Sequence, residues 1–247
     1  DWRKRQLIAL LTLQYSFDVD YLVPDPKELV LYDEQPFGAV VPKNECDDPS
    51  AKCTPGGEFQ ELKLLSSDLK GTIPPEVSFL TALTSLSLRD GELTGPLPSE
   101  LGELTALTSM YLHSNQLTGS IPQQVGALSS LVFLSLYDNQ LSSSLPRELG
   151  QLTDLVSLSL GGNQITGPLP EELGTLTELT FLSLYDNQLT GSIPPRLVQA
   201  TNLEHLIVNG NELTGSLASG ICAIPQLNNI VVDCRLVACD CPSCGCY

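Results

Sequence analysis

Residues that could carry out catalysis are few in this sequence. The two histidines, His113 and His205, are far apart along the chain, and no segment has the form H-E-x-x-H, G-x-S-x-G or a glycine-rich phosphate loop. Catalysis requires groups that converge on one point. We therefore expect a protein that is not an enzyme and that uses no cofactor.

The cysteines are the other reactive side chains, and they lie toward the two ends of the chain. They are Cys46, Cys53, Cys222, Cys234, Cys239, Cys241, Cys244 and Cys246. An even number of cysteines grouped in this way is typical of disulfide-bonded proteins from an oxidising compartment. Cys46 and Cys53 are close to each other and far from the rest, so we predict a disulfide between them.

The C-terminal cysteines allow two interpretations. The spacing C-x-C-x-x-C-x-C from Cys239 to Cys246 also suits a soft metal ion. We favour disulfides that close the end of the molecule, with Cys222 and Cys234 included, and no metal. Six cysteines allow fifteen pairings, and the sequence does not select one of them.

The charge of the chain limits its partners. Its net charge is −17, from 29 acidic and 12 basic residues, which disfavours nucleic acid and anionic membranes. No apolar run approaches the ~20 residues of a membrane span. The chain begins with Asp1, which fits either removal of a signal peptide or trimming of a longer chain. We expect a secreted or cell-surface protein.

A period of 24 residues organises most of the chain. It is defined by an apolar residue that is followed two positions later by a second one, in an L-x-L pattern. The first members are Leu62, Leu86, Met110, Leu134, Leu158, Leu182, Leu206 and Ile230. The alternation predicts a short strand with one buried face. Each repeat then continues through T-G and I-P or L-P, where Gly permits a turn and Pro limits further pairing. Such a unit can bury its apolar edge only by stacking on its neighbours, as in a solenoid.

The full pattern, LxxLxLxxNxLTGxIPxxLGxLTxL, resembles the plant-type extracellular leucine-rich repeat over roughly residues 59–233. The resemblance implies an α/β repeat fold, a leucine-rich-repeat solenoid of about eight 24-residue coils. It implies a parallel β-sheet on the concave face and a second run of extended structure after L-T-G. The cysteine-dense ending also resembles that of secreted repeat proteins from microalgae.

An asparagine recurs five residues after the first Leu of the central repeats. The members of this column are Asn115, Asn139, Asn163, Asn187 and Asn211. They resemble the asparagine ladder of the family, in which inward-facing amides bond to the backbone of adjacent coils; buried amides require such partners. Ser67 and Gly91 replace Asn toward the N-terminus, where we expect a weaker ladder.

Three segments follow from the repeat boundaries. Residues 1–58 should form an N-terminal cap with a helix, since residues 1–17 have apolar residues at helical spacing. Residues 59–233 form the solenoid, and residues 234–247 form a cysteine-rich C-terminal cap. Caps cover the apolar edges of the terminal coils.

Residues beside the L-x-L leucines should point outward from the concave sheet, and they include an aromatic and acidic strip. The nonapeptide FLSLYDNQL occurs twice, two coils apart, and supplies much of this strip as matched sets ~10 Å apart. The candidate partner-binding residues are Arg89, Tyr111, His113, Phe133, Tyr137, Asp138, Phe181, Tyr185, Asp186 and His205. The alternative is that the rings only fill spaces between strands.

Three functions compete at this point. The leading one is a non-catalytic, secreted or cell-surface recognition module that binds a protein or polysaccharide through its concave face. It resembles receptor ectodomains and polygalacturonase-inhibiting proteins, although fold does not fix function. The second is a structural subunit of an extracellular or lumenal multi-protein assembly. The third is binding to ice or a mineral surface through regularly spaced Thr and Ser residues, which turns also require.

Overall fold

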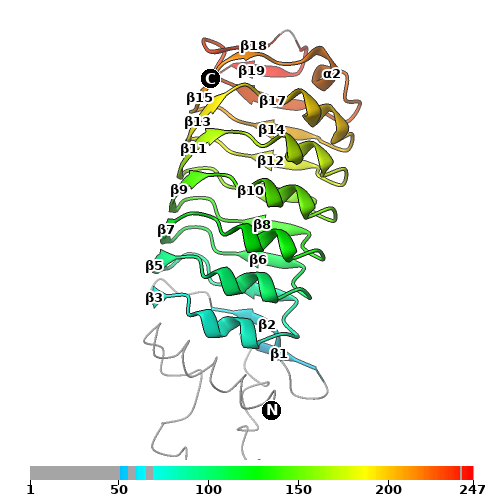
Figure 1. Cartoon of the computed structure of the whole chain (residues 1–247). Helices are drawn as coiled ribbons and strands as arrows, with labels where there is room; N and C mark the ends of the chain where they lie inside the picture. The colour runs from blue at the N-terminus through cyan, green and yellow to red at the C-terminus, as the bar shows by residue number, and fades with distance from the viewer. Residues whose placement is uncertain (1–50, 55–58, 65–68, 240, 247) are drawn as a thin grey trace, which may run out of the picture.

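The computed structural model describes residues 51–54, 59–64, 69–239 and 241–246. They form an elongated solenoid in which successive coils stack from the N-terminal to the C-terminal end (Figure 1). The helix predicted within residues 1–58, and Cys46, lie outside the described residues. Within the described ranges, no helix is long and apolar enough to cross a membrane.

A ten-stranded sheet forms one face of the solenoid and confirms the predicted one-strand-per-coil arrangement. Its strands, in spatial order, are β1 (Ala51–Cys53), β2 (Phe59–Lys63), β4 (Ser85–Ser87), β6 (Ser109–Tyr111), β8 (Phe133–Ser135), β10 (Ser157–Ser159), β12 (Phe181–Ser183), β14 (His205–Ile207), β17 (Asn229–Val232) and β19 (Cys244–Cys246). Leu134 pairs with Leu158, which pairs with Leu182, so paired residues differ by one repeat. We call this surface the ten-stranded face; it corresponds to the concave side expected for the fold.

The two edges of this sheet use segments that the repeat pattern does not cover. β1 runs antiparallel to β2, whereas the other pairs are parallel. β19 pairs in parallel with β17 at the C-terminal end. Because a strand is added at each edge, both terminal coils have a partner for their backbone hydrogen-bonding groups.

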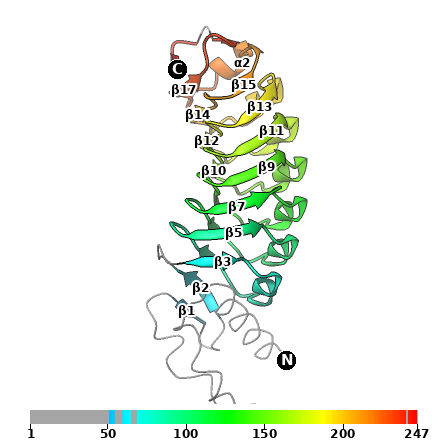
Figure 2. The ribbon, with the colours of Figure 1, turned by 90° about the vertical axis from the view of Figure 1, so that its left-hand side faces the viewer.

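A second sheet confirms the second run of extended structure that the resemblance implied, but its strands include the L-T-G residues themselves and do not follow them. Its strands are β3 (Lys70–Thr72), β5 (Glu92–Pro96), β7 (Gln116–Gly119), β9 (Gln140–Ser144), β11 (Gln164–Pro168), β13 (Gln188–Gly191) and β15 (Glu212–Leu213). Figure 2 shows these strands in front, with the ten-stranded sheet on one side and the short helices on the other. A further pair, β16 (Gly215–Ser216) and β18 (Val237–Ala238), ties the C-terminal segment to the last coil.

The third side of each coil is a five-residue 3-10 helix. These helices are η2 (Pro75–Phe79), η3 (Ser99–Glu103), η4 (Gln123–Ala127), η5 (Arg147–Gln151), η6 (Glu171–Thr175) and η7 (Pro195–Gln199). A proline precedes each one, for example Pro146 with φ −70° before η5, because its fixed φ suits a helix start. The α-helical turn α2 (Ser219–Cys222) takes this place in the last coil.

Leucines from all three sides fill the interior and form one continuous core. The asparagine ladder lies beside this core, as predicted. The Nδ2 of Asn139 donates to the carbonyls of Leu112 (3.0 Å) and Leu136 (3.1 Å), and its Oδ1 accepts from the amide of Leu117 (3.0 Å). The same pattern repeats at Asn115, Asn163, Asn187 and Asn211.

Each ladder asparagine therefore joins two coils through their backbones. Gly91 contributes no side chain to this ladder, and Ser67 lies outside the described residues. At the C-terminal end, the backbone amide of Asn211 donates to a carboxylate oxygen of Asp233 (3.1 Å).

Candidate functional site

Two rows of side chains flank the buried middle residue of each strand on the ten-stranded face, one residue before it and one residue after it. The first, which we call the Phe133 row, consists of Glu61, Ser85, Ser109, Phe133, Ser157, Phe181, His205 and Asn229. The second, the Tyr111 row, consists of Lys63, Ser87, Tyr111, Ser135, Ser159, Ser183, Ile207 and Val231. Serines lie on both sides of Phe133 in the first row and on both sides of Tyr111 in the second, so these two aromatic side chains have small neighbours in their rows. In the second row, Ser87, Ser135 and Ser183 are themselves buried.

A third row follows the strands, one residue after the second leucine of each L-x-L. Its described members are Arg89, His113, Tyr137, Gly161, Tyr185, Asn209 and Asp233. We call it the Tyr137 row.

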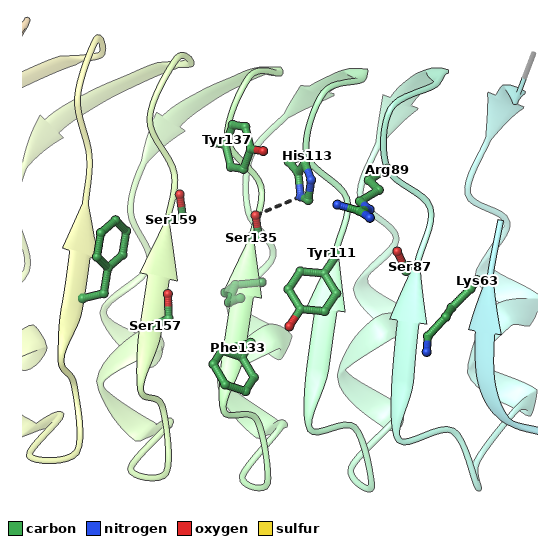
Figure 3. Close-up of a pocket in the computed structure, with 12 residues that line it drawn as sticks. Lys63, Ser87, Arg89, Tyr111, His113, Phe133, Ser135, Tyr137, Ser157 and Ser159 are labelled. Carbon is green, nitrogen blue, oxygen red and sulfur yellow. Dashed lines mark hydrogen bonds between the residues drawn. The ribbon is translucent and has the colours of Figure 1, made fainter. Parts of the chain in front are cut away.

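An open cavity of about 640 Å³ spans the three rows over the N-terminal and middle coils. It brings together six of the predicted site residues, which are Arg89, Tyr111, His113, Phe133, Tyr137 and Phe181. Figure 3 shows Tyr111, Phe133 and Tyr137 with His113 and Arg89 above neighbouring strands, and serines between them. The remaining predicted residues, Asp138, Tyr185, Asp186 and His205, do not line this cavity.

The cavity is also lined by Lys63, Ser87, Ser135, Ser157 and Ser159, which are not among the predicted site residues. The repeat register places each of them on the same face, since each occupies a position equivalent to a predicted aromatic site residue in another repeat. Their small or flexible side chains gave no reason to single them out.

His113 is held firmly at the centre of the cavity. Its ring stacks on Tyr137 with 4.4 Å between centroids and meets Tyr111 edge-on at 6.3 Å. Its Nδ1 lies 3.0 Å from the Ser135 hydroxyl. Burial is the main cause that lowers the pKa of His113 below its usual 6.5, and the Asp90 carboxylate opposes this effect. The imidazole is therefore neutral at pH 7 and serves as a packed ring with a hydrogen-bonding nitrogen.

Tyr185 makes a contact within the protein that the repeat pattern did not reveal. Its ring lies against Gly161, where a Cβ atom would collide with it. Burial raises the pKa of Tyr185, and so does its hydrogen bond with the Asp138 carboxylate. Tyr185 thus covers Gly161, which lies between Tyr137 and Tyr185 in the Tyr137 row. No open space remains above Gly161.

The aspartates after Tyr137 and Tyr185 occupy a special backbone conformation. Positive φ angles occur at Asp90 (59°), Ser114 (56°), Asp138 (52°), Gly162 (63°), Asp186 (48°) and Gly210 (67°). Asp, Asn and Gly are favoured in this left-handed region. The turn itself therefore accounts for Asp in this column, so its recurrence does not by itself indicate ligand binding.

His205 lies beyond the C-terminal end of the cavity. Its ring is 5.7 Å from that of Phe181 between centroids, and its Nδ1 is 3.3 Å from Nδ2 of Asn229. His113 and His205 belong to coils whose strands, β6 and β14, are four apart in the sheet. At ~4.8 Å per strand they cannot act on one reacting centre.

Cationic side chains lie at the N-terminal end of the cavity. Lys63 pairs with Glu61 (2.7 Å), and Arg89 lies 3.7 Å from Asp90. Exposed pairs of this kind contribute only about 0–1 kcal/mol. Both cations can therefore exchange their partners for an anionic group of a ligand at small cost.

The C-terminal cysteines are paired as Cys222–Cys241, Cys234–Cys246 and Cys239–Cys244. The sulfur atoms of Cys239, Cys241 and Cys244 lie within 4.8 Å of one another. Each of these three sulfurs is used in a disulfide, which agrees with the favoured interpretation. The predicted Cys46–Cys53 disulfide is not described, because Cys46 and the side chain of Cys53 lie outside the described residues.

Solved structures with the same fold include plant receptors. The plant peptide hormone receptor RGFR1 in complex with RGF2 is 33% identical, with a TM-score of 0.67 over 69% of this chain and 27% of that chain. The ectodomain of the receptor kinase GASSHO1/SCHENGEN3 from Arabidopsis thaliana, in complex with CASPARIAN STRIP INTEGRITY FACTOR 2, is 29% identical, with a TM-score of 0.73 over 95% of this chain and 30% of that chain. The chain thus spans less than a third of those receptors.

A structure of more similar length is a plant ice-binding protein. It is 23% identical, with a TM-score of 0.70 over 96% of this chain and 87% of that chain. This likeness shows a shared fold alone. No curated protein sequence matches the chain.

Family models assign the repeats directly. The leucine rich repeat matches residues 105–165 in one model, and residues 178–199 and 202–224 in another. These segments include the coils of β6, β8, β12 and β14, in which the L-x-L strand and the asparagine ladder recur. A proline-started 3-10 helix follows in the coils of β6, β8 and β12. The chain belongs to the leucine-rich-repeat proteins, with repeats of the plant extracellular type.

Proposed function

We propose that this chain is a non-catalytic, secreted or cell-surface recognition module that binds an extended peptide on its ten-stranded face. The observation that carries the proposal is the exposure of Phe133. This residue lines an open cavity and remains 41% exposed, because the neighbouring residues in its row are small serines. Exposed aromatic anchors in a cavity are typical of interfaces. The receptors that share the fold, including one described as a peptide hormone receptor, support a peptide as the partner.

The chemistry of the cavity suits a peptide backbone. The hydroxyl groups of Tyr111, Ser157 and Ser159 can donate to carbonyl oxygens or accept from amides. Lys63 and Arg89 place two cationic side chains at the N-terminal end of the cavity, and each lies beside a carboxylate that a ligand's anionic group could replace. A partner with an acidic group over that end is therefore favoured.

Ice or mineral binding has no comparable support from the second sheet. In the regular column of Thr and Ser along the second sheet, the hydroxyls of Thr94 and Thr214 donate to the carbonyls of Gly71 (3.1 Å) and Gly191 (3.4 Å). These hydroxyls stabilise contacts between coils. For the role of a structural subunit, no particular surface of the described chain favours it over peptide binding.

The proposal is tested with a displayed library of random peptides and an array of plant and algal oligosaccharides. Both are probed with the wild-type protein, with Phe133→Ser and with Gln140→Ser. Serine occupies the position of Phe133 in neighbouring coils, so the fold accommodates the change, and Gln140 is an exposed residue of the same coil on the other sheet.

We expect peptides that bind the wild type and Gln140→Ser but lose at least about tenfold in affinity toward Phe133→Ser, a loss of ~1.4 kcal/mol. Binding that is equal for all three proteins would place the site elsewhere. Oligosaccharides alone binding in a Phe133-dependent way would make the partner a polysaccharide.

A further inference from the structure

The imidazole ring of His113 has one nitrogen with a hydrogen-bond partner and one without. Its Nδ1 lies 3.0 Å from the hydroxyl of Ser135. Among the residues that the structure describes, none makes a hydrogen bond with its Nε2. The residue is only 5% exposed, and yet it lines the cavity. A ligand that covers this place removes the remaining contact of Nε2 with water, so leaving the atom unpaired is costly.

The contacts of this ring keep it in one orientation. It stacks on Tyr137 with 4.4 Å between centroids and 12° between the ring planes, and it meets Tyr111 at 86°. Figure 3 shows the ring between Tyr137 and Arg89, with the Ser135 hydroxyl bonded to it. The ring cannot turn away without losing these contacts, so its unpaired nitrogen is held at a fixed place in the cavity.

The charges around the ring favour a neutral partner for Nε2. The carboxylates of Asp90 and Asp138 and the guanidinium of Arg89 all act on the ring electrostatically. A ligand carboxylate at this place would be repelled by the two carboxylates, and a ligand cation would be repelled by Arg89. Either ion would also lose more hydration than a neutral group beside a buried ring.

The partner must also suit either tautomer of the ring. If the Ser135 hydroxyl donates to Nδ1, Nε2 carries the proton and donates; if Nδ1 donates to Ser135, Nε2 accepts. A hydroxyl or a carboxamide can take either role, whereas an apolar side chain can take neither.

We infer that Nε2 of His113 determines specificity in the peptide site by selecting a neutral ligand side chain that can both donate and accept a hydrogen bond. Such groups are the hydroxyl of Ser or Thr and the carboxamide of Asn or Gln. This inference rests on the proposed function and deepens it. An acidic group of the same peptide can still pair with Lys63, because β2 lies two strands from β6, or ~9.6 Å.

The test uses the displayed library of random peptides, sorted in parallel on the wild type, His113→Phe and His113→Gln. Phenylalanine keeps an aromatic ring for the stack on Tyr137 but has no nitrogen. Glutamine loses the ring, but its amide nitrogen is as many bonds from Cα as Nε2 of histidine, and the amide can donate or accept. Thermal unfolding checks that both variants are folded.

We expect peptides selected on the wild type to share one position that is occupied by Ser, Thr, Asn or Gln. Replacing that residue by Ala should weaken binding to the wild type about five- to fiftyfold, because Nε2 is then covered and unpaired. The same replacement should change binding to His113→Phe by less than about twofold, whereas His113→Gln should retain a preference for the polar residue. The ¹⁵N signal of Nε2 should shift more with the selected peptide than with its Ala counterpart.

Three results would overturn the inference. The first is the lack of a shared polar position among peptides whose binding depends on Phe133. The second is a preference for the polar residue that His113→Phe leaves intact, and the third is a shared Asp or Glu whose preference His113→Phe removes. In each case binding at Phe133, and with it the proposed function, would stand. If no peptide depends on Phe133, the proposed function fails and the inference fails with it.

Discussion

At His113, burial of the ring makes its protonation less favourable in the folded protein. Its pKa is lowered in the folded protein, chiefly by burial, so the folded state favours the neutral ring. The stability that this provides is present above the unfolded-state pKa of about 6.5 and is lost as the pH falls through the lower folded-state value. The nearby Asp90 and Asp138 moderate the loss, whereas Arg89 adds to it.

We therefore expect the wild type to lose stability between pH 7 and pH 5, and His113→Gln to lose less over the same interval. The measurement is the free energy of unfolding in urea at several pH values, combined with the titration of the His113 ring by NMR. Parallel pH profiles for the two proteins would show that His113 does not contribute in this range.

Ser143 occupies a position in the repeat where the two neighbouring coils have glycine. Its φ is 69°, and the equivalent residues of the neighbouring coils are Gly119 and Gly167, both at φ 76°. Left-handed backbone costs a residue with a Cβ about 1–2 kcal/mol, and part of this is offset by the greater unfolded-state freedom of glycine. Ser143→Gly should therefore stabilise the protein by about 0.5–1 kcal/mol.

Denaturant unfolding measures this change, and Ser144→Gly is the matched control. Ser144 is the next exposed residue of β9 and does not have a positive φ, so glycine there should reduce the stability. If both substitutions changed the free energy of unfolding in the same direction, the explanation from backbone strain would be wrong.

At the scale of the element, the asparagine ladder joins each coil to the next. Asn163 donates to the carbonyls of Leu136 and Leu160, and its Oδ1 accepts from the amide of Leu141. Asn163→Ala leaves these buried groups without their partner, at about 1–3 kcal/mol for each unsatisfied group. Since some relaxation occurs, we expect a total loss of about 2–4 kcal/mol.

Gln164→Ala is the control, because Gln164 is the exposed neighbour of Asn163 on β11. The free energy of unfolding should change by less than about 0.5 kcal/mol in this variant. Hydrogen exchange at the Leu141 amide should rise selectively in Asn163→Ala. Comparable losses in both variants would argue against a structural ladder.

The elements also show which features the sequence could predict. The 24-residue period predicted the strand positions, because every coil must meet the same neighbours. The ladder and the second sheet were implied by the resemblance to the plant-type repeat. The ring of Tyr185 on Gly161 was not predictable, since it depends on how one side chain crosses to the preceding coil. The alternation of Asp138 with Gly162 could have indicated a left-handed turn, which uses both residue types.

At the scale of the whole molecule, each coil contacts mainly its neighbours, so stability spreads along one dimension and the ends control fraying. The N-terminal edge of the ten-stranded sheet is covered by the antiparallel strand β1. The C-terminal edge has β19, α2 and three disulfides within the described residues. We expect the loss of one C-terminal disulfide to have a local rather than a global effect.

The Cys222→Ser/Cys241→Ser variant tests this, because that disulfide ties α2 to the C-terminal segment. A disulfide of this kind typically contributes about 2–4 kcal/mol, here to the last coil alone. Hydrogen exchange should increase in β15, β17 and β19 and remain unchanged in β8 and β10, since a linear array frays from its end. Ligand binding that depends on Phe133 should also persist, because β8 lies several coils away. An increase in exchange that is uniform along the solenoid would instead indicate a single cooperative unit, in which the cap supports the binding face directly.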